Sequence, residues 1–184
     1  TNNSSKSVSA YVEKLNKLGI KATADDFMTS IDATIEFLKD KYGKDARKKL
    51  IYIMGTKSFE NQMRENGFNV TTDESPYVDI VLCGFDRELT YKKLEDICRM
   101  LLDKSRNIDY YATNPDWVCP TWYGYVPDCG SVSQMLFNAT TRMPKFIAKP
   151  EPTMALLAME KAGYGPDETA VIGDRLYTDI ACGV

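Results

Sequence analysis

Short apolar runs alternate with helix-patterned segments along most of this chain of 184 residues. Runs with the length and composition of buried strands occupy residues 49–54, 68–71, 79–83 and 108–112. Apolar residues at helical spacing predict helices over residues 8–18, 31–42, 58–66 and 90–102. Strands that alternate with helices in this way favour a parallel sheet covered by helices. We therefore expect an α/β fold.

The same pattern continues toward the C-terminus. We expect helices over residues 131–140 and 153–162, and strands at 146–147 and 169–172. The stretch 113–130, which contains both tryptophans, is expected to be irregular. Its aromatic side chains are suited to lining a substrate pocket or to packing in cores and loops, and the sequence leaves both interpretations open.

Histidine is absent from the sequence. Its absence excludes Ser-His-Asp and Cys-His catalysis and histidine-bound metals, so acid–base chemistry must come from Asp, Glu, Lys or Tyr. The five cysteines are scattered and form no Cys-x-x-Cys pair, which favours reduced thiols over zinc or disulfide bonds. We therefore expect a cytoplasmic protein.

Charge and hydropathy argue against further classes. The net charge of −3 disfavours general nucleic-acid binding, which needs a basic surface. No apolar run approaches the ~18 residues that a membrane span needs, and the polar start leads us to expect no signal peptide. We expect a small-molecule partner, with neither nucleic acid nor membrane.

The pair Gly173-Asp174 has the strongest chemical signal. It directly follows the apolar run 169–172, and a helix is expected to begin just after it. Open α/β sheets bind ligands at the carboxyl ends of their strands, and magnesium prefers carboxylate oxygens. Asp174 is therefore the better candidate metal ligand, with Asp179 in a supporting role. Taken alone, Asp174 is more often a simple helix cap.

Two more segments have groups suited to phosphate. Lys149 precedes Pro150, and proline favours an extended backbone before it, which aims the lysine from a rigid strand end. Such a lysine can neutralise phosphate charge, although a solvated lysine is the simpler interpretation for it alone. Residues 1–5, Thr-Asn-Asn-Ser-Ser, offer hydroxyl, amide and N–H groups to phosphate oxygens, or serve as ordinary caps.

Together these segments resemble the haloacid dehalogenase superfamily, most closely its NagD-like, para-nitrophenylphosphatase branch. Residues 1–5 resemble the second motif of that branch and Lys149-Pro150 the third. Gly173-Asp174, with Asp179, resembles the fourth motif. The resemblance covers essentially the whole chain and implies magnesium-dependent hydrolysis of phosphate esters through an aspartyl-phosphate.

The resemblance also implies a role for each matched residue. Thr1 and Asn2 would bind the transferring phosphoryl group, and Lys149 would stabilise that group and the nucleophile. Asp174 would bind Mg²⁺, supported by Asp179. Phosphoryl transfer depends mainly on positioning and charge neutralisation, which these residue types supply. The implied substrates are small phosphate monoesters: sugar phosphates, glycerol or glycolate phosphate, nucleotides and, as an artificial one, para-nitrophenyl phosphate.

For the fold, the resemblance implies a Rossmann-like core into which a large α/β cap domain is inserted. We place partial core segments at residues 1–21 and 144–184 and the cap at residues 22–143. Residues of the cap that we expect to contribute to substrate specificity are Asn114, Asp116, Asp128, Gly130 and Ser131. The family is compatible with a homo-oligomer.

The first motif of the family, Asp-x-Asp-Gly, supplies the nucleophile and does not occur in the 184 residues. We therefore expect this chain to be a fragment of a phosphatase, and we expect the fragment by itself to be inactive. Two alternatives stay open. One is a phosphotransferase of the same superfamily, and the other is a non-catalytic binding or dimerisation module.

Overall fold

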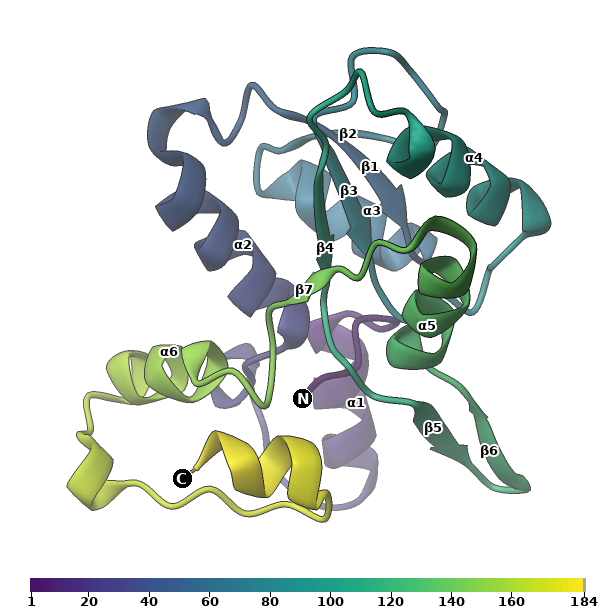
Figure 1. Ribbon diagram of the computed structural model, residues 1–184. Helices are drawn as coiled ribbons and strands as arrows, with labels where there is room; N and C mark the ends of the chain where they lie inside the picture. Colours follow the sequence, from purple (N-terminus) through teal and green to yellow (C-terminus); the bar gives the residue numbers. More distant parts are fainter. Residues whose placement is uncertain (184) are drawn as a thin grey trace.

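The computed structural model describes residues 1–183. Its centre is a five-stranded sheet in which all neighbouring strands are parallel, in the order β2-β1-β3-β4-β7 (Figure 1). The strands are β1 (Leu50–Met54), β2 (Asn69–Thr71), β3 (Ile80–Cys83), β4 (Asp109–Ala112) and β7 (Lys145–Phe146). The expected α/β class is confirmed.

Helices surround this sheet. They are α1 (Val8–Lys17), α2 (Ser30–Tyr42), α3 (Lys57–Glu65), α4 (Tyr91–Leu102), α5 (Cys129–Thr140) and α6 (Thr153–Ala162). The side-chain hydroxyls of Thr29, Thr56 and Thr90 accept N–H bonds at the starts of α2, α3 and α4, which satisfies donors that a helix start leaves free. The helices that we expected at these positions are therefore confirmed.

The sheet separates two apolar cores because successive residues of a strand point to opposite faces. In β1, Ile51 and Ile53 pack in a core with residues of α2, α3 and α6. Tyr52 and Met54, which alternate with them, pack in a second core with residues of α4 and α5. Burial on both faces explains why these strands read as continuous apolar runs.

The stretch 113–130 is more regular than we expected. Val118–Thr121 (β5) and Gly124–Pro127 (β6) form an antiparallel hairpin, separate from the main sheet. Gly124 begins β6 at a φ of 134°, a backbone conformation that side chains other than hydrogen disfavour. The expectation of an irregular stretch is therefore wrong for these eight residues.

The strand expected at residues 169–172 is not formed. These residues pair with no strand among residues 1–183, and Ile172 is 93% exposed. A β-strand needs a neighbour for its backbone N–H and C=O groups, and an apolar run alone does not supply one. The remaining short elements are 3₁₀ turns at Ala24–Asp26, Gly43–Asp45 and Pro166–Glu168, and a π-helical turn at Leu176–Ile180.

The N-terminal segment lies across the carboxyl ends of the central strands. Thr56, Phe85 and Thr113 follow β1, β3 and β4, and each is hydrogen-bonded to Ser4 or Ser5 at 2.8–3.4 Å. Figure 1 shows the N-terminus, α1, α6 and the last helical turn gathered at this end of the sheet. The polar segments of the sequence thus meet where parallel sheets bind ligands.

The sheet continues past residue 143, where we placed the end of the cap. β7 pairs with β4, and the N–H groups of Ile147 and Ala148 donate to the carbonyls of Ala112 and Thr113 at 3.1 and 2.9 Å. The domain boundaries themselves stay a prediction. Within residues 1–183, no helix combines the length and the apolar character that crossing a membrane demands.

Candidate active site

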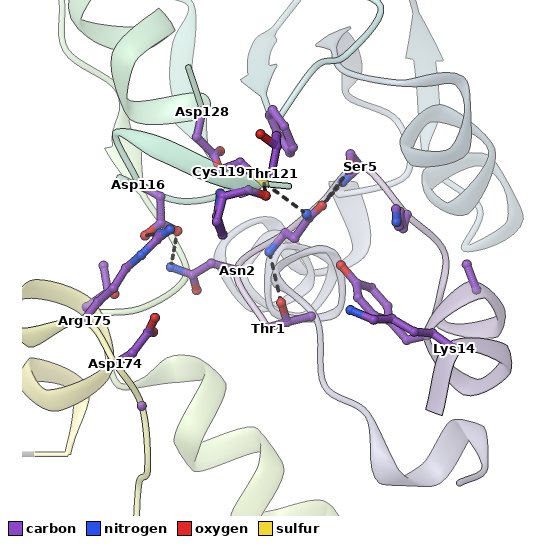
Figure 2. A pocket seen from close by; sticks show the side chains of 18 of the residues that line it. Thr1, Asn2, Ser5, Lys14, Asp116, Cys119, Thr121, Asp128, Asp174 and Arg175 are labelled. Carbon is purple, nitrogen blue, oxygen red and sulfur yellow. Dashed lines mark hydrogen bonds and ion pairs between the residues drawn. The ribbon is translucent and has the colours of Figure 1, made fainter. Parts of the chain in front are cut away.

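A cavity of about 880 Å³ lies at the end of the sheet where the N-terminal segment and the last helical turn meet. Most of the residues that the sequence singled out line it, and they come from four separate parts of the chain. Figure 2 shows Thr1, Asn2, Asp116, Asp128 and Asp174 among them. These lining residues are Thr1, Asn2, Asp116, Asp128, Lys149, Asp174 and Asp179. The fold thus brings together groups up to 178 positions apart, from Thr1 to Asp179.

The loop of residues 1–5 is held by its own side chains. The side-chain oxygen of Asn3 accepts hydrogen bonds from the backbone N–H of Ser5 at 2.8 Å and from the Ser5 hydroxyl at 2.7 Å. The Ser4 hydroxyl oxygen accepts the Phe85 N–H at 2.8 Å, which anchors the loop to the sheet. Thr1 is exposed on the cavity wall, so its hydroxyl can reach a ligand there.

Asn2 is 91% buried and has one unsatisfied atom. Its side-chain nitrogen donates to a carboxylate oxygen of Asp116 at 2.9 Å and to the carbonyl of Lys149 at 3.1 Å. Both partners are acceptors, so the orientation of the amide is fixed and its oxygen Oδ1 has no donor among the described residues 1–183. A buried acceptor without a partner costs about 1–3 kcal/mol, so a ligand donor that reached this oxygen would be favoured.

Lys149 and Asp179 form an ion pair in the cavity wall, with side chains 20% and 12% exposed. Burial acts to raise the pKa of the Asp179 carboxyl, but the Lys149 ammonium and the Arg175 N–H outweigh it, so this pKa is lowered. The second oxygen of Asp179 accepts that Arg175 N–H at 3.3 Å. Both carboxylate oxygens are therefore occupied, which suits Asp179 to a supporting role.

Asp174 differs from Asp179 because it is exposed and makes no hydrogen bond or ion pair with residues 1–183. Figure 2 shows its carboxylate facing the same space as the side chain of Asn2. No cluster of three or more Cys, Asp or Glu side chains able to hold a metal occurs among the described residues. Magnesium commonly takes only one or two carboxylates and keeps several waters, so a site centred on Asp174 fits it.

Arg175 was not predicted from the sequence as a residue of this site. Its guanidinium pairs with Asp116 and donates to the Val118 carbonyl at 2.8 Å. Burial acts to lower the pKa of Arg175, but the Asp116 carboxylate outweighs it and raises the pKa. The only hint in the sequence was the position of this arginine directly after Gly173-Asp174.

Behind the cavity wall, Asn114 joins two acidic residues that were predicted to set specificity, Asp116 and Asp128. Its side-chain nitrogen donates to Asp116 at 3.0 Å and to Asp128 at 3.2 Å, and its side chain is fully buried. Asp128 also caps α5 through the N–H of Cys129. Burial raises the pKa of Asp128, and the Asp116 charge adds to this although the two hydrogen bonds oppose it.

Three of the residues predicted to set specificity do not line the cavity: Asn114, Gly130 and Ser131. Gly130 packs directly on the backbone of Pro115, and the Ser131 hydroxyl donates to the carbonyl of Trp117 at 2.5 Å. These contacts shape the loop that carries Asp116. The aromatic side chains of the region also lie outside the cavity, and Trp122 is 95% exposed.

Comparisons with known proteins all find similarity to one group of hydrolases. Residues 1–69 match the family model described as haloacid dehalogenase-like hydrolase, and residues 146–184 match one described as HAD-hydrolase-like. An acid sugar phosphatase of Staphylococcus aureus is 31% identical over all 184 residues, which span 68% of that protein. The chain thus spans about two thirds of the length of such relatives.

Solved structures similar to this chain support the same family. A 4-nitrophenylphosphatase of Thermotoga maritima superposes with a TM-score of 0.87 at 34% identity, over 99% of this chain and 66% of that one. A protein described as a putative nagD protein gives a TM-score of 0.88 at 35% identity, over 100% of this chain and 69% of that one. A glycerol phosphate phosphatase of Mycobacterium tuberculosis, in complex with calcium, gives 0.86 at 27% identity, over 100% and 54%.

Proposed function

Because the chain belongs to the haloacid dehalogenase-like hydrolases, in their NagD-like branch of enzymes acting on phosphate monoesters, we propose that the protein hydrolyses small phosphate monoesters with Mg²⁺ as its cofactor. The observation that supports this most is the convergence of Thr1, Lys149 and Asp174 on one cavity. These residues come from the three segments that resemble the family motifs. Phosphoryl transfer needs this kind of convergence, because it depends on positioning and charge neutralisation.

In this proposal the chain holds the phosphoryl group from two sides. The Thr1 hydroxyl and the N–H groups of the N-terminal loop donate hydrogen bonds to its oxygens. The Lys149 ammonium, fixed by its ion pair with Asp179, places a positive charge beside the oxygens as negative charge develops on them. A charge already held in place needs no reorganisation during the reaction, so it lowers the barrier.

Asp174 is the residue that would hold Mg²⁺, with its exposed carboxylate, which has no partner among residues 1–183. The unsatisfied oxygen of Asn2 offers a second polar contact nearby for the ion's waters or for a ligand donor. When bound, the ion would neutralise phosphate charge and orient the ester. Asp179 contributes indirectly, because it orients Lys149 and the backbone of Arg175.

The nucleophile is proposed to be an aspartate of an Asp-x-Asp-Gly segment that belongs to the same protein and lies outside these 184 residues. The pattern occurs nowhere in the sequence described. The proposed path is an aspartyl-phosphate, formed on that aspartate as the alcohol leaves and then hydrolysed by water. On this view residues 1–184 alone bind phosphate but do not form the covalent intermediate.

The proposed substrates are sugar phosphates, glycerol or glycolate phosphate, and nucleoside monophosphates. The similar proteins named above act, by their descriptions, on sugar phosphate, 4-nitrophenyl phosphate and glycerol phosphate. The cavity volume of about 880 Å³ is within the range of small-molecule sites. Cysteine usage led us to expect a cytoplasmic enzyme, and that location remains part of the proposal.

The test is phosphate release by the intact gene product from a panel of phosphate monoesters, with Mg²⁺ and then with excess EDTA. We expect release that EDTA abolishes and that added Mg²⁺ restores. Absence of release from every ester, by folded protein with its Asp-x-Asp-Gly segment, would contradict the proposal. Adding glycerol as an acceptor separates the alternative, because a phosphotransferase would form glycerol phosphate in place of free phosphate.

A further inference from the structure

We propose that Asp116 is a positioning residue that, through Arg175, holds the Asp174 loop against the N-terminal loop, and that it does not contact the substrate. This inference rests on the proposed function, because it assigns Asp174 to metal binding. From the sequence we expected Asp116 to contribute to substrate specificity, and a specificity role and a positioning role make different predictions. The contacts of Asp116 distinguish them.

Both carboxylate oxygens of Asp116 are already used by the protein. One oxygen pairs with the Arg175 guanidinium. The other accepts the side-chain N–H groups of Asn2 at 2.9 Å and of Asn114 at 3.0 Å. The side chain is only 2% exposed, so three donors surround a carboxylate that water hardly reaches. A substrate hydroxyl would have to displace one of these donors to bind it.

Arg175 extends this contact in two directions. Besides its bond to Asp116, the guanidinium donates to the Val118 carbonyl at 2.8 Å, which ties it to the start of β5. Its backbone N–H donates to Asp179 at 3.3 Å. The planar guanidinium presents several donors in a fixed geometry, and this lets one side chain hold two acceptors at once.

The contacts close into a ring. Asp179 pairs with Lys149, and the carbonyl of Lys149 accepts the same Asn2 nitrogen that donates to Asp116 (Figure 2 shows the Asn2–Asp116–Arg175 part). Asp116 of the predicted cap thus links the three segments that resemble family motifs: residues 1–5, Lys149-Pro150 and residues 173–179. Removing a member leaves a buried or partly buried polar group without its partner, which is costly where water reaches that group poorly.

Asp174 precedes Arg175 in the chain, so the position of its carboxylate depends on where Arg175 is held. Loss of the Asp116–Arg175 pair would release the 173–179 segment and weaken metal binding, without removing any substrate contact. Residues that orient metal ligands from behind typically change metal affinity by about 10–100-fold. A direct substrate ligand would instead change KM for the ester.

The experiment compares Asp116→Asn, Arg175→Gln and their combination in the intact gene product. Asp25→Asn is the control, because Asp25 forms an exposed ion pair with Lys161 at 3.6 Å, outside the cavity. Arg175→Lys is a second variant that keeps the charge and loses the forked geometry. Hydrogen exchange of residues 173–179 is measured without Mg²⁺ or substrate. Phosphate release then gives KM and the Mg²⁺ concentration for half-maximal rate.

We expect faster exchange at residues 173–179 in both single variants, with no further increase in the combination. We also expect at least about a tenfold rise in the half-maximal Mg²⁺ concentration, with KM for the ester at saturating Mg²⁺ changed less than threefold. Unchanged exchange in Asp116→Asn, or a raised KM at unchanged Mg²⁺ dependence, would overturn the inference. If the wild-type protein releases no phosphate, the proposed function fails, and exchange alone still decides whether Asp116 holds this loop.

Discussion

Gly130 permits the loop that carries Asp116 to pack against the start of α5, and replacing it with alanine tests this packing. A Cβ atom at Gly130 would lie 2.2 Å from the carbonyl oxygen of Pro115 and 2.8 Å from that of Asp116. Ordinary contacts begin near 3.4 Å, so the backbone would have to move by about 1 Å. The Gly130 N–H also donates to the Asp116 carbonyl at 2.8 Å, and this shift would strain that bond.

The expected loss of free energy of unfolding in Gly130→Ala follows from two opposing effects. Overpacking against backbone atoms costs about 3 kcal/mol, the upper part of its usual range, because backbone cannot rotate away as a side chain can. Alanine in place of glycine in a helix returns about 1 kcal/mol. We therefore expect Gly130→Ala to lower the free energy of unfolding by about 2 kcal/mol, and Tm by about 4–8 °C for a chain of this size.

The assay is urea denaturation followed by circular dichroism, with Gly165→Ala as the matched control. A Cβ at Gly165 would meet only the end of the Glu168 side chain, at 3.8 Å, and φ there is −90°. We expect this control to be neutral or up to about 1 kcal/mol more stable, because alanine restricts the unfolded chain. If Gly130→Ala is as stable as the wild type within about 0.5 kcal/mol, the close packing described here is incorrect.

Three further predictions concern the cavity and its surroundings. Asp174→Asn should reduce Mg²⁺-dependent phosphate release more than about tenfold, or 1.4 kcal/mol of barrier, and unchanged release would remove Asp174 from the metal site. Burial raises the pKa of the Asp128 carboxyl above its ordinary value of 3.8, so the folded protein binds the carboxyl proton more tightly than the unfolded chain does. The free energy of unfolding therefore falls as the pH rises from the unfolded pKa through the folded pKa of this group. Asp128→Asn should remove this contribution to the pH dependence of the free energy of unfolding, measured by urea denaturation between about pH 3.5 and pH 7. If the variant and the wild type show the same pH dependence, the pKa of Asp128 is not raised by burial. Trp122→Ser at the tip of the β5–β6 hairpin should change neither KM nor stability beyond about 0.5 kcal/mol, whereas a raised KM would show that this ring reaches the substrate.

The main sheet could be predicted because its strands are buried on both faces. Residues 80–83 are continuously apolar for this reason, and β3 forms there. The β5–β6 hairpin could not be predicted in the same way. Its strands are half exposed, so no core imposes an apolar alternation, and its turn residues Trp122 and Tyr123 lack the Asn-Gly or Asp-Gly signal of tight hairpins.

Residues 169–172 show the opposite failure. Their composition is that of a strand, but a strand exists only when a neighbour satisfies its backbone, and no described strand lies beside them. Composition reports which surface a segment tends to bury, whereas pairing depends on the partner. The sequence of one segment therefore cannot settle whether it becomes a strand.

From the sequence we singled out individual residues that the fold brings to one cavity, but not the contacts that join them. Thr1, Lys149 and Asp174 were chosen because each has a chemical group suited to phosphate or metal beside a strand or helix end, and they line one cavity. Arg175 was missed because arginine is ordinarily a surface residue, and its partner Asp116 lies 59 positions away. Contacts between residues so far apart in the sequence are formed only by the fold, so no short sequence pattern predicts them.

The central claim is that the cavity binds the phosphoryl group of a phosphate ester through Lys149. The most direct measurement is kcat/KM for phosphate release by the intact gene product, compared between Lys149→Met and Lys145→Met. Lys145 is an exposed lysine of β7 outside the cavity, with its ammonium 5.0 Å from the Phe37 ring. We expect a loss of more than about tenfold for Lys149→Met and a near-normal rate for Lys145→Met. Equal rates for the two variants would contradict it.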